Sequence, residues 1–133
     1  MRSANIPLSL YVHWPWCVRK CPYCDFNSHA LTSSYDPSHQ YIDALIHDLK
    51  RSISYAQNRE LISIFIGGGT PSLIIPQELE RFLEAVFSHF KIAANVEITL
   101  EANPGTVDTA HFKAYRSIGI NRLSMGIQSF NYE

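Results

Sequence analysis

The 133-residue sequence predicts an α/β fold in which short strands alternate with helices along the chain. Runs rich in β-branched and aromatic residues are separated by segments whose apolar residues recur at helical spacing. Glycine or proline stands where these runs end. Because strands that alternate with helices pair in parallel through right-handed crossovers, we expect about four parallel strands and three helices.

The first half of the chain predicts two strands and a helix. Residues 8–13 form a short strand that must stop at Trp14-Pro15. Apolar residues recur at helical spacing over residues 38–56, and the preceding Asp36-Pro37 is a suitable helix start. Residues 62–66 are an apolar run stopped by three glycines, which is typical of a strand buried on both faces.

A second helix and a third strand follow. Pro76 opens the helix, since proline is well placed in a first turn. The residues expected to face the core are Leu79, Phe82, Leu83, Val86, Phe87 and Phe90. Residues 96–100 then read as a strand, with Asn103-Pro104-Gly105 as its breaker.

The C-terminal segment predicts a third helix and a fourth strand. Asp108 and Thr109 can cap a helix through about Ser117, and Gly119 stands where a left-handed C-terminal cap is wanted. Residues 122–125 form the fourth strand. Because the sequence ends before any helix that could cover this strand, we expect residues 1–133 to be one domain that is incomplete at its C-terminus.

Composition narrows the class of protein. A net charge of −1 and an apolar fraction of 46% fit a globular unit. We expect no nucleic-acid partner, because a basic stripe is absent. We expect no membrane span either, because no apolar run approaches about 20 residues. The N-terminus lacks the pattern of a secretory signal, so the cytoplasm, where thiols stay reduced, is the expected compartment.

All three cysteines lie in one loop, as Cys17-x-x-x-Cys21-x-x-Cys24. An odd number of clustered thiols in a reducing compartment favours metal or cluster ligation over disulfides. Three thiolates could hold a 4Fe-4S cluster and leave one iron open to a substrate. The alternatives are a zinc site with His29 as fourth ligand, or three structural cysteines. His13, at a strand end, reads as an orienting group rather than a ligand.

The segment from Tyr11 through His13, Pro15 and Cys17 to Cys24 resembles the cluster motif of the radical S-adenosylmethionine (SAM) family. Within that family the chain is similar, over about residues 8–130, to oxygen-independent coproporphyrinogen III oxidase and to its heme-chaperone relatives. The resemblance implies the N-terminal part of a partial (β/α)6 barrel, with a 4Fe-4S cluster and SAM bound at the carboxyl ends of its strands.

The resemblance also implies which residues contact SAM. Gly68 in the turn after the second strand would face it, and Glu101 would accept hydrogen bonds from its ribose hydroxyls or amine. Other implied contacts, to this SAM or to a second ligand, are Tyr11, Tyr23, Gly69, Thr70 and Gln128. From the residues alone, a tight turn and a surface glutamate would explain the glycines and Glu101 equally well.

One position separates the two relatives. The oxidase carries an additional cysteine two residues after its last cluster ligand, and here that place is Phe26. The pattern therefore resembles the heme chaperone, which binds heme and passes it to an acceptor protein. The alternative is the oxidase, which removes carboxyl groups from porphyrinogen propionates. Whether the chain is an enzyme stays open, and either activity would need an electron donor for the cluster.

Overall fold

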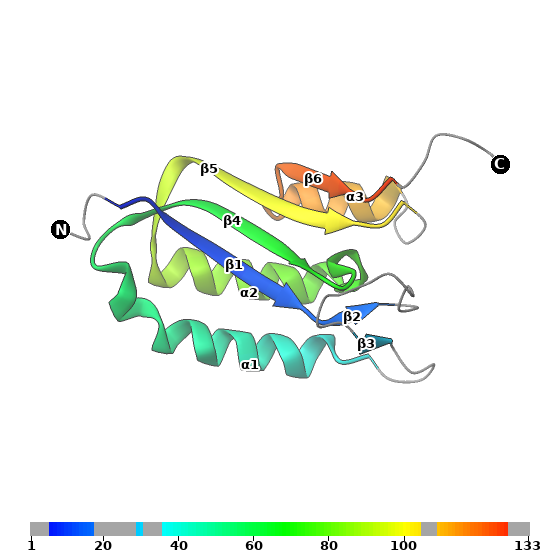
Figure 1. Ribbon diagram of the computed structural model, residues 1–133, viewed down its shortest axis with the longest axis horizontal. Coiled ribbons are helices and arrows are strands. Elements are labelled where there is room, and N and C mark those ends of the chain that lie inside the picture. Colours follow the sequence, from blue (N-terminus) through cyan, green and yellow to red (C-terminus); the bar gives the residue numbers. More distant parts are fainter. Residues whose placement is uncertain (1–5, 18–28, 31–35, 105–108, 128–133) are drawn as a thin grey trace.

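The computed structural model describes residues 6–17, 29–30, 36–104 and 109–127. Four parallel strands form one sheet in the order β1-β4-β5-β6 (Figure 1). They are β1 (Leu8–Trp14), β4 (Glu60–Gly68), β5 (Lys91–Ala102) and β6 (Arg122–Met125). The helices between them are α1 (Ser38–Arg51), α2 (Pro76–His89) and α3 (Thr109–Ser117). The predicted α/β fold with four parallel strands and three helices is confirmed.

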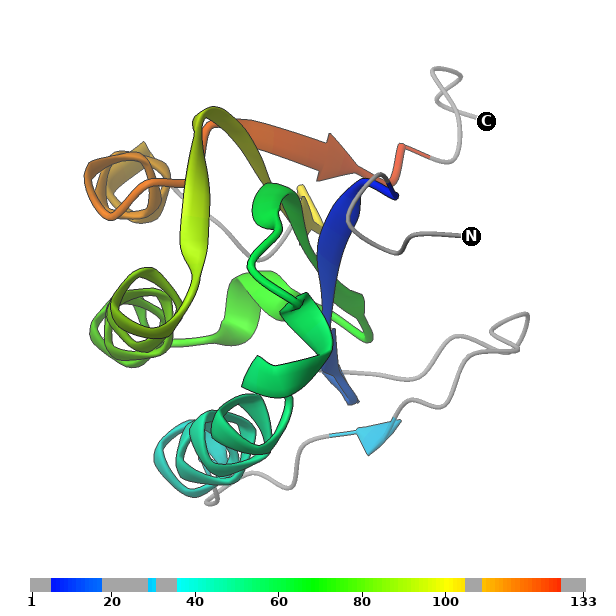
Figure 2. The same ribbon diagram turned by 90° about the vertical axis from the view of Figure 1, so that its left-hand side faces the viewer.

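The three helices lie on one side of the sheet, and the core forms between them and that face (Figure 2). Alternate strand residues point into it, as the two-residue period of a strand requires. The buried sheet residues include Val12, Ile64, Ile66, Ile98 and Leu100, and the helices contribute Ile42, Leu49, Leu79, Leu83 and Val86.

The opposite face of the sheet is not covered by a helix of the described part of the chain (Figure 2). Here Tyr11 is 58% exposed. The expectation that residues 62–66 are buried on both faces is therefore wrong: Phe65 is only half-buried and Ile62 is 46% exposed. We call this surface the open face.

Side chains on the open face line up in rows across the strands. One row runs from Tyr11 through Phe65 and Thr99 to Arg122. The next row toward the carboxyl ends pairs His13 with Gly67, and Glu101 with Ser124. These pairings bring residues that are far apart in sequence to one end of the open face.

The helices differ from their predicted forms in two places. The segment predicted to be helical through residue 56 changes after Arg51 to a 3-10 turn, η2 (Ile53–Ala56). Gln57 and Asn58 then adopt positive φ angles of 49° and 66°, which turn the chain toward β4. Phe87, predicted to be in the core, is 41% exposed, because it lies at the margin of the apolar face of α2.

The predicted left-handed cap at Gly119 is confirmed. Its φ angle is 119°, and the Ile120 N–H donates to the carbonyl oxygen of Tyr115 at 3.1 Å. The chain then enters β6 at the predicted residue, Arg122.

Three short elements were not predicted. Two of them, β2 (Trp16–Cys17) and β3 (His29–Ala30), pair in parallel, and the third is a 3-10 turn, η3 (Pro71–Leu73). The β2–β3 pairing joins segments that are distant in sequence, which a local pattern does not reveal. In the described ranges, no helix is both long and apolar enough to cross a membrane.

Candidate functional site

The carboxyl ends of the four parallel strands meet at one edge of the sheet (Figure 1). The segment after β1 leads to Cys17, β4 leads into the glycine turn at residues 67–70, and β5 ends just beyond Glu101. Most predicted site residues that the structure describes therefore lie at this edge. In parallel α/β folds, this is where ligands bind, because the loops after the strands converge there.

The glycine turn is hydrogen-bonded to the segment that carries Cys17. The N–H of Gly69 donates to the Trp14 carbonyl at 2.6 Å, and the N–H of Thr70 donates to the Trp16 carbonyl at 2.7 Å. Cys17 itself is buried. The turn therefore holds the base of the cysteine loop in place from the β4 side.

Each glycine is packed too closely to accept a side chain. Gly68 has a φ angle of +121°, and a β-carbon there would overlap the Trp14 carbonyl and lie 3.0 Å from the His13 ring. A β-carbon at Gly69 would lie 2.5 Å from the Trp16 carbonyl oxygen, and one at Gly67 would lie 2.6 Å from Oε1 of Glu101. The protein's own atoms thus fill the space beside all three glycines.

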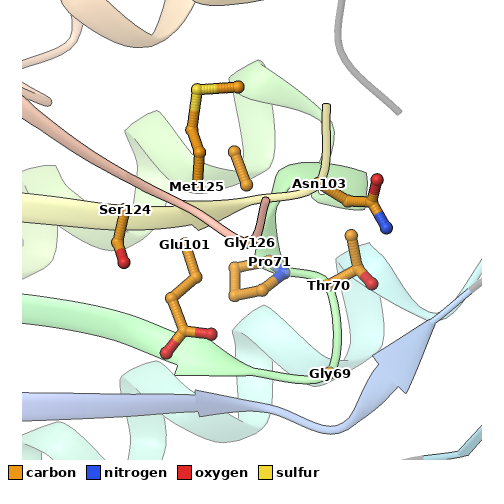
Figure 3. Close-up of a pocket in the computed structure, with 9 residues that line it drawn as sticks. Gly69, Thr70, Pro71, Glu101, Asn103, Ser124, Met125 and Gly126 are labelled. Atoms are coloured by element: carbon orange, nitrogen blue, oxygen red, sulfur yellow. The ribbon is translucent and has the colours of Figure 1, made fainter. Parts of the chain in front are cut away.

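Glu101 lies at the end of β5, and its side chain points over the end of β4 (Figure 3). It is half-buried, and its carboxylate accepts no hydrogen bond from any residue that the structure describes. Burial raises the pKa of Glu101, and the nearby His13 opposes that rise. An acceptor that has lost part of its hydration suits a ligand with hydroxyl or amine donors.

A cavity of about 220 Å³ opens beside this carboxylate. Its lining comes from the segments that follow β4, β5 and β6: Gly69, Thr70, Pro71, Glu101, Ala102, Asn103, Ser124, Met125 and Gly126. Ser124 points to the same side as Glu101, and Met125 to the opposite side (Figure 3). Sequence reasoning missed Asn103 and Ser124 as site residues. Their positions at the carboxyl ends of strands are the signal that could have identified them.

Tyr11 and His13 form the β1 side of the site. The Tyr11 hydroxyl lies 3.0 Å from Nδ1 of His13, and the Tyr11 ring stacks on Phe65 with centroids 6.2 Å apart. The Tyr41 hydroxyl of α1 donates to the His13 carbonyl at 2.5 Å. Burial, and then the charge of Glu101, raise the pKa of Tyr11.

Four predicted residues lie outside the described ranges, namely Cys21, Tyr23, Cys24 and Gln128. Of the three cysteines, the structure therefore describes Cys17 alone. The zinc alternative involves His29, whose backbone pairs with Trp16 in the β2–β3 ladder. Cys17, Tyr11, Gly68, Gly69, Thr70 and Glu101 are all brought to the carboxyl half of the open face or to the loops beside it.

Comparison with known proteins identifies relatives of this chain. A model of the Radical SAM superfamily matches residues 11–133. The chain is 53% identical over 127 residues to Heme chaperone HemW of Escherichia coli K12, covering 96% of this chain and 33% of that protein. It is 54% identical over 129 residues to Heme chaperone HemW of Haemophilus influenzae, covering 94% and 33%.

A solved structure is also similar. It is the coproporphyrinogen III oxidase HemN from Escherichia coli, described as a radical SAM enzyme. The TM-score is 0.85 at 34% sequence identity, and the match covers 94% of this chain and 29% of the oxidase chain. The present chain thus spans about a third of the length of the curated relatives that it matches.

Proposed function

The chain belongs to the radical SAM superfamily, and we propose that it forms the cofactor-binding part of a heme chaperone. The observation that carries the proposal is that buried Cys17, the glycine turn and the half-buried Glu101 meet at one edge of the sheet. Relatives at 53% and 54% identity are named heme chaperones, which supports the assignment to heme.

Cys17, Cys21 and Cys24 would hold a 4Fe-4S cluster through their thiolates. The described part of the site fits this role, because Cys17 is a buried thiol and the carbonyl of the preceding Trp16 accepts a hydrogen bond from the glycine turn. When bound, the cluster would supply one-electron chemistry toward SAM at the iron that lacks a protein ligand. In the zinc alternative, His29 would supply a fourth protein ligand.

Glu101 would accept hydrogen bonds from the ribose hydroxyls or the amine of SAM. The N–H groups of Gly69 and Thr70 already donate to Trp14 and Trp16. We therefore assign the turn, with Gly68, to shaping the cavity and holding the cysteine segment, rather than to donating hydrogen bonds to the ligand. Contacts from Tyr11, Tyr23 and Gln128 complete the proposed site.

Heme would be the cargo, to be passed to an acceptor protein, with an electron donor serving the cluster. Residue 26 supports the chaperone over the oxidase, because Phe26 stands where the oxidase pattern has a further cysteine. The 0.85 TM-score to the oxidase makes porphyrinogen decarboxylation the second candidate. The cytoplasm, where the thiols stay reduced, is the proposed compartment.

The relatives are about three times as long as this chain. We propose that residues 1–133 are the first part of a radical SAM core domain, which further β-α units complete.

Two assays on the anaerobically purified full-length protein would test this function. Heme titration followed by absorbance should show saturable binding, and mixing with a heme-free acceptor protein should transfer the heme. Incubation with coproporphyrinogen, SAM and a reductant should give no decarboxylated product. Formation of that product, without heme binding, would assign the oxidase activity instead.

A further inference from the structure

We propose that His13 is a positioning residue of the SAM site, and that the charge of its imidazole controls how well Glu101 binds SAM. The inference rests on the proposed function, because SAM is the ligand that Glu101 would take up. His13 lies on β1 and Glu101 on β5, with β4 between them.

The two side chains share the open face because of residue 67. His13 pairs with Gly67 in the β1–β4 ladder, and the Glu101 carboxylate lies against Gly67 from the β5 side. With glycine there, β4 places no side chain between them at this row. The Phe65 ring closes the row on its amino-terminal side, since it lies 2.8 Å from a β-carbon built on Gly67.

The His13 imidazole is held in position by its neighbours. Its Nδ1 is hydrogen-bonded to the Tyr11 hydroxyl, and its main-chain carbonyl accepts from Tyr41. Two ring atoms lie 3.0 Å from the position of a β-carbon on Gly68, so a glycine is needed there to admit the ring. When the Tyr11 hydroxyl donates to Nδ1, a neutral imidazole carries its proton on Nε2.

Among the described residues, the ionisable side chains on the open face near this pair are Tyr11 on β1 and Arg122 on β6. Gly67 and Phe65 on β4 and Ser124 on β6 do not ionise, and Tyr41 of α1 donates to the main-chain carbonyl of His13. Within the described ranges, the pKa of Glu101 is raised by burial and lowered by one side chain, His13. A cationic His13 therefore favours the ionised carboxylate.

The sign of the pH dependence follows from this arrangement. Ionised Glu101 accepts hydrogen bonds from SAM, and protonation removes that capacity, so affinity falls on the acid side. Because a positive charge on His13 lowers the pKa of Glu101, that charge delays protonation of the carboxylate as the pH falls. Without that charge, Glu101 should protonate at a higher pH.

The test measures SAM affinity by anaerobic equilibrium dialysis between pH 5.5 and 8.5. It uses the cluster-loaded full-length protein, with iron and sulfide content determined for each sample. In His13→Gln the acid limb of the affinity profile should move up by about half a pH unit, the order expected for loss of one screened charge. The affinity at pH 8.5 should stay within about twofold of wild type, because the Glu101 carboxylate is ionised in both proteins there.

The matched control is His47→Gln, which makes the same substitution at an exposed residue of α1. Its profile should superpose on that of the wild type. If His13→Gln fails to load the cluster, His13→Asn, which keeps a neutral hydrogen-bonding side chain, takes its place.

Glu101→Gln separates this inference from the proposed function. It should weaken binding at every pH, and adding His13→Gln to it should cause no further shift of the profile. If Glu101→Gln binds SAM as the wild type does, then the proposed site itself is wrong. If Glu101→Gln binds weakly but the single His13→Gln profile superposes on the wild type, the role of His13 is overturned while the site stands.

Discussion

The carboxylate of Glu101 occupies the position that a side chain at residue 67 would need: a β-carbon built on Gly67 would lie 2.6 Å from Oε1 of Glu101. The half-buried side chain of Glu101 on β5 thus lies against β4 at a residue that has no side chain. The glycine run serves the placement of Glu101 and His13 as well as the tight turn after β4.

Replacing Gly67 with alanine should displace the Glu101 carboxylate, because the flexible end of that side chain gives way more easily than the strand. We expect about a tenfold loss of SAM affinity in the full-length protein, with about 1–3 kcal/mol of destabilisation from overpacking. Dialysis and urea unfolding measure the two effects. Gly119→Ala, at a φ of +119° near the end of α3, should destabilise by about 1 kcal/mol without changing SAM affinity. Equal loss of SAM affinity in both variants would contradict the prediction.

The cysteine assignment predicts about four iron and four sulfide per chain after anaerobic reconstitution, because a cubane cluster contains four of each. Alanine at Cys17, Cys21 or Cys24 should abolish the cluster, since two thiolates do not hold it. Iron, sulfide and zinc analysis measures this outcome. If the wild type instead holds stoichiometric zinc and no sulfide, and His29→Ala loses that zinc, the zinc alternative is correct.

Tyr115 connects α3 to the segment that follows the glycine turn. Its buried hydroxyl lies 2.8 Å from the carbonyl oxygens of both Ser72 and Ile74, and burial raises the pKa of Tyr115. Tyr115→Phe should remove a buried hydrogen-bond donor and reduce the free energy of unfolding by about 1–3 kcal/mol. Urea unfolding measures the change. Tyr55→Phe, at a side chain that is 75% exposed, is the control that should unfold as the wild type does.

Arg81 on α2 joins the two longest helices. Its guanidinium bonds to Asp43 of α1 at 2.5 Å and to Glu78 at 2.7 Å. The hydrogen bond from Arg81 lowers the pKa of Asp43. Burial acts to raise the pKa of Glu78, but hydrogen bonds from His39 and Arg81 outweigh it and lower that pKa.

Arg81→Met should therefore lower Tm by about 1–3 °C at pH 7, a modest effect because Arg81 and Asp43 are partly exposed to solvent. Because folding lowers the pKa of both carboxyl groups, their interactions stabilise the protein at pH values above the ordinary carboxyl pKa. This stabilisation is lost as the pH falls through the lowered pKa. The difference in Tm between wild type and variant should shrink below about pH 4. A difference that is constant from pH 7 to pH 3 would show that the effect is one of packing.

Local sequence patterns were sufficient to predict the main elements. Four runs separated by helical periodicity predicted the parallel strands, and β6 begins and ends at the predicted residues. The burial of the second predicted strand was predicted wrongly. Periodicity shows that a strand is apolar, but it does not show which face the helices cover. Ile62 and Phe65 therefore belong to an open face rather than to a strand covered on both sides.

The site was predicted less completely, because its geometry depends on register. Tyr11, the glycine turn and Glu101 were predicted as site residues from the resemblance to the radical SAM family. The pairing of Glu101 with Ser124, and the approach of His13 to Gly68, follow from which strands are neighbours in the sheet. Ser124 and Asn103 carry no motif of their own, so only the assembled sheet identifies them as lining residues.

The short β2–β3 ladder has a consequence for the entropy of cofactor loading. It pairs Cys17 with Ala30, and residues 21 and 24 lie on the chain between these two positions. Bringing together the ends of a free segment costs an entropy that grows with the logarithm of its length. Here the backbone pairing of Cys17 with Ala30 itself closes the segment. The loop-closure entropy is therefore borne by folding and does not add to the cost of binding an iron-sulfur cluster.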